Sequence, residues 1–282
     1  MKTYIVPIDF SETSDHAAEF AALLSNQTEV AHIVLMHSYH VSVYESVLPT
    51  PDMIIPSEEE IEEQVREKTK QLEHIRTKIH KLARPGVIVH VRVNRSPLVR
   101  AIIETISAEN ADLVILGSNG TNINNISHVG SNVVNISKLS PVPVVVVPPA
   151  CHYELIKRVV MACDFNKVKD SIPLEPLKKL LSRHDVELLV VNIDKQARHK
   201  NADPQMLAEE TDLHQMLKEY HPKYYYSEAD DIINGILNFA NVHHSQLVIA
   251  LPHKYSFFQS LLHNSVSHEL SIKSAMPVLL LK

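Results

Sequence analysis

The amino-acid sequence predicts an α/β protein built from two tandem domains, each with a parallel sheet that helices cover on both faces. Near-continuous apolar runs alternate with amphipathic segments in the order β-α-β-α-β-α-β-α-β, which is typical of a sheet buried on both sides. The pattern stops around Pro148 and starts again around Arg158. A chain of 282 residues is long enough for two domains of about 140 residues each.

The first half is predicted to contain five strands and four helices. The first strand ends at Asp9, and Ser11 offers an oxygen to cap the following helix. The longest helix begins at the capping residue Ser57 and carries its acids early and its bases late, as the helix dipole favours. In chain order the predicted elements are a strand at 3–8, a helix at 11–26, a strand at 31–38, an irregular proline-containing insertion at 40–56, a helix at 57–84, a strand at 86–93, a helix at 96–110, a strand at 111–117, a helix at 130–140 and a strand at 142–148.

The second half repeats the first. The segment from Arg158 has the same apolar strand and Asp-Phe turn as the segment from Tyr4, and residues 245–282 align with residues 111–148 without a gap. A third match joins 186–194 to 31–39. An internal duplication explains these similarities. The predicted domains are therefore residues 1–148 and 156–282.

Three of the five glycines in the chain follow the predicted fourth strand, at Gly117, Gly120 and Gly130. Glycine is used where the backbone needs a positive φ or a close approach, and we expect Gly117 and Gly120 to bend the chain tightly. In an open parallel sheet, ligands bind outside the carboxyl ends of the strands, where the strand order reverses. The N–H groups at the start of the next helix, together with the Ser131 hydroxyl, suit a phosphate group.

Three features of the first half resemble the ATP-binding, UspA-like members of the universal stress protein family. They are the spacing Gly117-x2-Gly120-x9-Gly130-Ser131, the opening segment YIVPIDFSETSDHA and the closing strand SPVPVVVVP. The resemblance covers nearly the whole chain, as two tandem copies. It implies two Rossmann-like domains similar to the adenine nucleotide alpha hydrolases, each a five-stranded parallel sheet of order 3-2-1-4-5. It further implies that the two closing strands pair with each other and form an internal pseudo-dimer.

The same resemblance implies which residues hold an adenine nucleotide, namely ATP, ADP or AMP, with or without Mg²⁺. The residues implied are Pro7, Asp9 and Ser38 at the adenosine end, Leu116 and Gly117 at the ribose, and Gly120, Gly130, Ser131 and Asn132 around the phosphates. Two alternatives stay open. Asp9 can instead close a turn or cap the following helix, and the glycine loop can be a tight loop without a ligand. No catalytic or metal-binding residue is predicted.

The loop after Gly120 departs from the family pattern. Many family loops carry Arg or Lys there, whereas TNINNISHV offers only His128 as a potential cation. Position 133 is Val, where some ATP-binding members have a hydroxyl residue. We therefore expect weak triphosphate binding, or a preference for a less charged adenine nucleotide.

The second half has lost the glycines, so we expect it to bind no nucleotide in the equivalent place and to act as a structural or regulatory partner. The gapless alignment places Leu251, Lys254 and Asn264 on the three glycines and Ser265 on Ser131, and Asp164 matches Asp9. The loop around Phe257 is aromatic and apolar. It either packs on its own domain or forms a surface for a protein partner.

Composition and absent motifs narrow the function classes further. A formal net charge of −6 without a polybasic segment argues against nucleic acid and anionic membranes as partners. No apolar run reaches the roughly 18–20 residues of a membrane span. The first residues lack the features of a signal peptide, so a reducing, cytoplasmic location is expected, with Cys151 and Cys163 as ordinary thiols. The 18 histidines show no metal-binding motif.

The favoured function is a nucleotide-binding regulator of the stress response that is not a dedicated enzyme. One alternative is a ligand-free scaffold that engages an unknown protein partner through its second domain. Another is a slow ATPase or nucleotidyl-transfer enzyme, which the absence of GxxxxGK[ST], HxGH and SGGxDS motifs disfavours. Two tandem chains can in addition associate as a homodimer.

Overall fold

The computed structural model describes residues 2–40, 57–118, 131–149, 151–163, 178, 186–193, 204–250 and 276–281. Its first half contains β1 (Thr3–Pro7), α1 (Glu12–Leu24), the 3-10 helix η1 (Ser25–Gln27), β2 (His32–Ser38), α2 (Glu58–Leu82), β3 (Ile88–Asn94), α3 (Leu98–Glu109), β4 (Leu113–Gly117), α4 (Ser131–Leu139) and β5 (Val144–Val147). The second half contains β6 (Arg158–Ala162), β7 (Glu187–Ile193), α7 (Pro204–Leu217), the 3-10 helix η3 (Lys218–Tyr220), β8 (Lys223–Ser227), α8 (Ile232–Val242), β9 (Leu247–Ala250) and β10 (Val278–Leu280). All nine elements that the sequence predicts for the first half are present.

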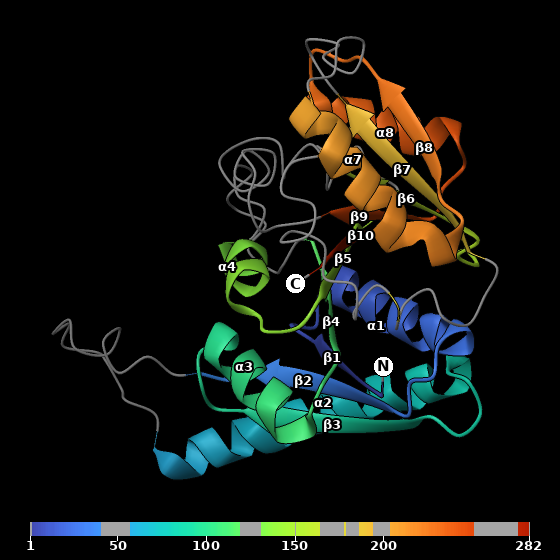
Figure 1. Ribbon diagram of the computed structural model, residues 1–282. Coiled ribbons are helices and arrows are strands. Elements are labelled where there is room, and N and C mark those ends of the chain that lie inside the picture. The colour runs from blue at the N-terminus through green and yellow to red at the C-terminus, as the bar shows by residue number, and fades with distance from the viewer. Residues whose placement is uncertain are drawn as a thin grey trace, which may run out of the picture.

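The strands form one ten-stranded sheet of order β3-β2-β1-β4-β5-β10-β9-β6-β7-β8. The first five strands have the expected order 3-2-1-4-5, and the last five repeat it from the opposite end of the sheet. Every pairing is parallel except the central one, where β5 and β10 run antiparallel. Figure 1 shows this junction, with β5 in green and β10 in red. The predicted pairing of the closing strands is thereby confirmed.

The strand registers confirm the internal duplication. In the first half Val114 pairs with Val144, and their counterparts Val248 and Val278 pair in the second half. At the junction Val145 pairs with its own counterpart, Leu279. The two halves are therefore related by a local two-fold axis through this pair. Because β5 and β10 are antiparallel, the strands of the first half run in the opposite direction to those of the second half. The carboxyl ends of the strands therefore lie on opposite sides of the sheet in the two halves.

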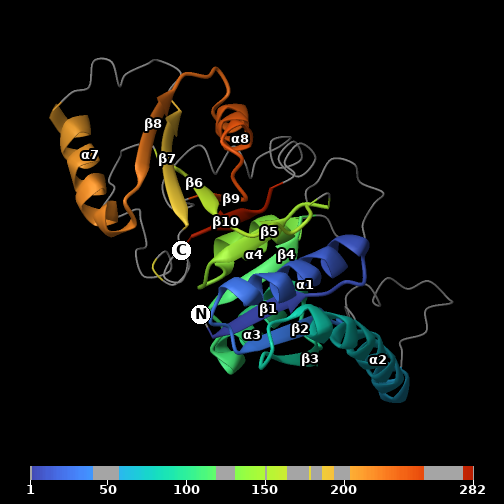
Figure 2. The same cartoon turned by 90° about the vertical axis from the view of Figure 1, so that its right-hand side faces the viewer.

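The helices cover both faces of the sheet (Figure 2). One core contains residues of α1, α2 and α7 together with alternate strand residues such as Tyr4 and Met161, and it runs through both halves. The opposite face carries α3, α4 and α8 over strand residues such as Ile5 and Val160. Side chains alternate between the two faces along each strand. The sheet is thus buried on both sides, as the apolar runs predict.

Capping residues mark where the main helices of the first half begin. Ser11 caps α1 by accepting a hydrogen bond from the Ser14 N–H. Ser57 and Glu60 form a reciprocal capping box at the start of α2. Pro97 precedes α3 without a side-chain cap, and Asn110 ends that helix in the left-handed conformation. These starts confirm the predicted helix beginnings at Ser11 and Ser57.

The segment between the two halves packs against the end of α1. The side chain of Gln27 donates to the Ile156 carbonyl at 3.0 Å and accepts from the Ile156 N–H at 2.8 Å and from the Tyr153 hydroxyl at 2.5 Å. The Tyr153 ring meets Phe20 edge-on, with centroids 5.4 Å apart. The proposed division into domains 1–148 and 156–282 stays a prediction. Among the described helices, none combines the length and apolar character needed to cross a bilayer.

Candidate functional site

The candidate site lies at the carboxyl edge of β1, β2 and β4 in the first half. Tyr4 pairs with Leu113 and Ile5 with Val114, so β1 and β4 are neighbours, as expected. From β1 the chain continues to β2 on one side, and it later returns to β4 on the other side. This is the point of strand-order reversal where α/β sheets bind ligands.

The turn after β1 is ordered by Asp9. Its Oδ1 accepts hydrogen bonds from the Ser11 N–H at 3.0 Å and from the Ser11 hydroxyl at 2.5 Å. Between them, Phe10 has a φ of 64°, in the left-handed region. Pro7 is half-buried at the end of β1. Asp9 therefore closes the turn that leads into α1, which was one of the two roles expected for it.

Gly117 is required for a different reason than the one expected. Its φ is not in the left-handed region, and it ends β4 as extended backbone instead of forming a tight bend. A Cβ atom at this position would lie 2.6 Å from Thr13 Cγ2 and 2.8 Å from the Thr13 carbonyl oxygen. Glycine is therefore needed because the first turn of α1 packs directly on the end of β4. The neighbouring Leu116 side chain is buried in the core on the opposite face, so only its backbone can face the edge.

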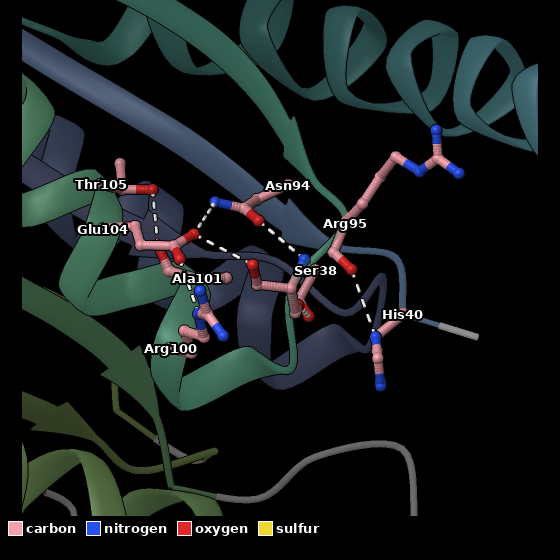
Figure 3. A network of polar contacts seen from close by, with 9 residues as sticks. Ser38, His40, Asn94, Arg95, Arg100, Ala101, Glu104 and Thr105 are labelled. Atoms are coloured by element: carbon pink, nitrogen blue, oxygen red, sulfur yellow. Dashed lines mark hydrogen bonds and ion pairs between the residues drawn. The ribbon is translucent and has the colours of Figure 1, made fainter. Parts of the chain in front are cut away.

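Ser38 belongs to a polar network that joins β2 to the start of α3. Its hydroxyl donates to the Ser96 carbonyl at 2.8 Å. Glu104 accepts from Asn94 at 3.2 Å and forms an ion pair with Arg100 at 2.7 Å, as Figure 3 shows. These contacts give Ser38 a structural role, since they hold the end of β2 against the loop before α3.

The remaining predicted residues are Gly120, Gly130, Ser131 and Asn132, which precede or begin α4 in the sequence. This helix begins at Ser131, and the Asn132 side chain is exposed. The first N–H groups of a helix have no partner within the helix, so they suit an anion. Gly120 and Gly130 lie outside the described residues, as do His128 and the second-half positions Asp164, Leu251, Lys254, Phe257, Asn264 and Ser265.

Two further residues at this edge were not assigned a role from the sequence. Ser118 follows β4 and donates its N–H to the Val147 carbonyl at 2.9 Å, and its buried hydroxyl has no hydrogen-bond partner among the described residues. His37, near the end of β2, places Nδ1 2.7 Å from the Ile8 carbonyl. A polar residue at the end of an apolar run is the sequence signal that could have pointed to both of them.

The electrostatics of the edge are mixed. Burial lowers the pKa of His37, and the nearby Lys68 acts in the same direction, while the hydrogen bond to Ile8 and the Asp9 carboxylate oppose the shift. Lys68 Nζ lies 4.9 Å from the Phe10 ring centroid, as a cation–π contact. Within the ranges that the structure describes, no group of three His, Cys, Asp or Glu side chains could hold a metal ion.

Comparison with known proteins identifies the family. The model of the universal stress protein family matches residues 1–148, which is more than half of the 282 residues, so the chain belongs to this family. Comparison with curated protein sequences gives no match.

Three solved structures are similar over the whole chain. A universal stress protein from Archaeoglobus fulgidus DSM 4304 has a TM-score of 0.65 at 17% identity and covers 99% of this chain and 96% of that one. A protein of unknown function from Pseudomonas aeruginosa PAO1 has a TM-score of 0.55 at 13% identity, with coverages of 100% and 92%. The cytoplasmic domain of a prokaryotic cation chloride cotransporter has a TM-score of 0.50 at 11% identity, with coverages of 99% and 94%. At these identities the likeness shows the fold alone.

Proposed function

We propose that the first half of this universal stress protein binds an adenine nucleotide at the carboxyl edge of β1 and β4. The bound nucleotide would shift the conformation or assembly of the protein, which acts in the cytoplasm as a regulator of the stress response and not as a dedicated enzyme. The observation that carries the proposal is the adjacency of β1 and β4, which brings the Asp9 turn and the end of β4 at Gly117 to the same end of the sheet. The sequence places the start of α4 at Ser131 after the glycine-spaced segment that follows β4.

The chemistry of the edge suits the two ends of such a ligand. The ordered carboxylate of Asp9 would accept hydrogen bonds from ribose hydroxyls or from adenine. The buried hydroxyl of Ser118, which has no partner in the described part of the chain, would gain one from a bound ligand. The N–H groups that begin α4 would bind the phosphates, and the family resemblance adds Ser131 to this end of the ligand. We propose the nine residues implied by the family resemblance as the ligand set, together with Ser118.

The phosphate end of the proposed site is poor in cations. The segment from Thr121 to Val129 contains no Lys or Arg. Each added phosphate brings negative charge that backbone dipoles offset only partly. We therefore propose that ATP binds with Mg²⁺, and that without Mg²⁺ the protein prefers ADP or AMP.

Calorimetric titration of the full chain with ATP, ADP and AMP, with and without Mg²⁺, tests this proposal. The key variant is Gly130→Trp, which puts a bulky side chain directly before the first residue of α4 in the sequence. The matched control is Asn264→Trp, which places the same side chain at the equivalent position of the second half. We expect saturable binding by the wild type and the control, and none by Gly130→Trp.

Other outcomes would contradict the proposal. If none of the three nucleotides binds the wild type, the ligand-free scaffold replaces it. Equal loss of binding in both Trp variants would show that the first half has no special role. Steady phosphate release faster than about 1 s⁻¹, the low end for dedicated enzymes, would instead support the enzyme alternative.

A further inference from the structure

Phe10 has an unusual backbone conformation for its residue type. Its φ of 64° lies in the left-handed region, which a bulky side chain seldom adopts. Among the described residues, the other non-glycine residues with positive φ are Asn110, His221 and His244. These three follow the ends of helices, where the left-handed conformation is common. Phe10 instead precedes a helix, so contacts with the surrounding structure must hold it there.

Two side chains hold the Phe10 ring. The His37 ring lies against it, with centroids 4.7 Å apart and an angle of 46° between the planes. Lys68, on α2, places its ammonium group 4.9 Å from the centroid of the same ring. The ring also packs on the core that α1 and α2 share. Side chains from two elements, β2 and α2, therefore hold the Phe10 ring in place.

His37 is itself held in place by the first strand. Its Nδ1 lies 2.7 Å from the Ile8 carbonyl oxygen, which can only accept, so Nδ1 carries the hydrogen and donates it. The Ile8 N–H in turn donates to the Met36 carbonyl at 2.7 Å. The histidine therefore contacts the residue before Asp9 through its hydrogen bond and the residue after Asp9 through its ring.

We propose that His37, through its ring contact with Phe10, is a positioning residue for the nucleotide site. It holds the left-handed backbone at Phe10, and this backbone directs the Asp9 carboxylate and the start of α1 toward the edge beside β4. Lys68, on α2, supplies a second contact that holds the Phe10 ring. This inference rests on the proposed function, and it adds residues that set the geometry of the site without belonging to the ligand set.

The second half supplies an internal comparison. Asn192 occupies the position of His37 and donates its side-chain amide to the Cys163 carbonyl at 2.9 Å. In both halves the donor follows the acceptor residue by 29 positions. The hydrogen bond is therefore shared by both halves and serves the fold. At this position an aromatic ring, that of His37, is present only in the half that carries the glycine spacing. This difference assigns the His37 ring to the site.

Two substitutions separate the ring from the hydrogen bond. His37→Asn keeps the hydrogen bond in the form that the second half uses, but removes the ring. His37→Phe keeps a ring against Phe10, but removes the donor. We expect nucleotide affinity to follow the ring, with a loss of about tenfold in His37→Asn and near wild-type affinity in His37→Phe. Thermal stability should follow the hydrogen bond and fall only in His37→Phe.

The control is Asn192→Leu, which removes the equivalent hydrogen bond from the second half. It should lower stability without changing nucleotide affinity. Hydrogen exchange of the amides at residues 9–14 gives a readout that needs no nucleotide. We expect faster exchange in ligand-free His37→Asn than in the wild type, with the amides of β3 unchanged as an internal reference.

The outcomes separate this inference from the proposed function. Unchanged affinity and unchanged exchange in His37→Asn would overturn the role of the ring. A loss of affinity in His37→Phe with none in His37→Asn would assign the effect to the hydrogen bond and overturn it as well. If the wild type binds no nucleotide, the proposed function fails, and the exchange experiment alone decides whether His37 holds the turn.

Discussion

Gly117 lies where the first turn of α1 packs on the end of β4. Replacing it with Ala would bring a Cβ atom within 3.0 Å of the Thr13 backbone, which cannot move without displacing the helix. We expect Gly117→Ala to lower the free energy of unfolding by about 1–3 kcal/mol, as overpacking does. Urea denaturation measures this loss.

Ser118→Ala is the control for this substitution at the adjacent position. It removes a buried hydroxyl that makes no hydrogen bond within the described ranges, so the stability of the ligand-free protein should stay unchanged or rise. A Gly117→Ala protein as stable as the wild type would show that α1 can shift away from the sheet.

His37 should make stability depend on pH below neutrality. Its pKa in the folded protein is lowered, chiefly by burial and also by Lys68, against the opposing effects of the Ile8 hydrogen bond and Asp9. The unfolded chain therefore binds the proton more readily, and stability falls as the pH drops below the ordinary value of about 6.5. Above that pH both states are neutral and His37 contributes no pH dependence.

Chemical denaturation at a series of pH values checks this prediction. The difference in stability between the wild type and His37→Asn should be constant above neutrality and should change in favour of the variant at lower pH. A difference that does not vary with pH would contradict it. The comparison with the variant cancels the titration of the other histidines.

At the level of elements, the side chain of Gln27 anchors the connecting segment to η1. Gln27 is buried and satisfies both backbone groups of Ile156. Gln27→Leu would leave these groups and the Tyr153 hydroxyl without their partner. We expect a loss of about 3 kcal/mol in the free energy of unfolding, because buried polar groups left unpaired are costly. Thermal or urea denaturation would measure it.

The exposed neighbour Asn26 provides the control. Asn26→Ala removes longer hydrogen bonds, of 3.2 and 3.3 Å, and should cost less than about 1 kcal/mol. Equal effects of the two substitutions would mean that the connecting segment does not depend on Gln27. A distinct early unfolding transition in Gln27→Leu would show that this contact couples the two halves.

The whole molecule is organised by the antiparallel pair of β5 and β10. Each of these strands covers an edge that the other half would otherwise expose, and exposed sheet edges promote association. We expect residues 1–148, produced alone, to dimerise by pairing two copies of β5 as β5 pairs with β10 here. Light scattering coupled to gel filtration would show the doubled mass.

The full chain at the same concentration is the reference, because its β5 edge is already covered. A monomeric fragment that remains folded would refute the prediction. A fragment that fails to fold would instead show that the first half depends on the core it shares with β6, β7 and α7.

The sequence by itself determined the element order, the duplication and the boundaries of most strands and helices. Apolar periodicity reports which residues face a core, and capping residues such as Ser11 and Ser57 mark helix starts, so these features are encoded locally. It also predicted that β1 and β4 are neighbours, so that Asp9 and Gly117 lie at the same end of adjacent parallel strands.

Only the tertiary structure decided why particular residues are needed at that edge. Gly117 is needed because Thr13 packs against it, and Phe10 is held by His37 and Lys68. Gln27 hydrogen-bonds to the connecting segment. Each of these contacts joins residues that are distant in sequence. Periodicity shows which way a side chain points, but its partner is set by how closely separate elements pack, and that packing distance leaves no local pattern in the chain.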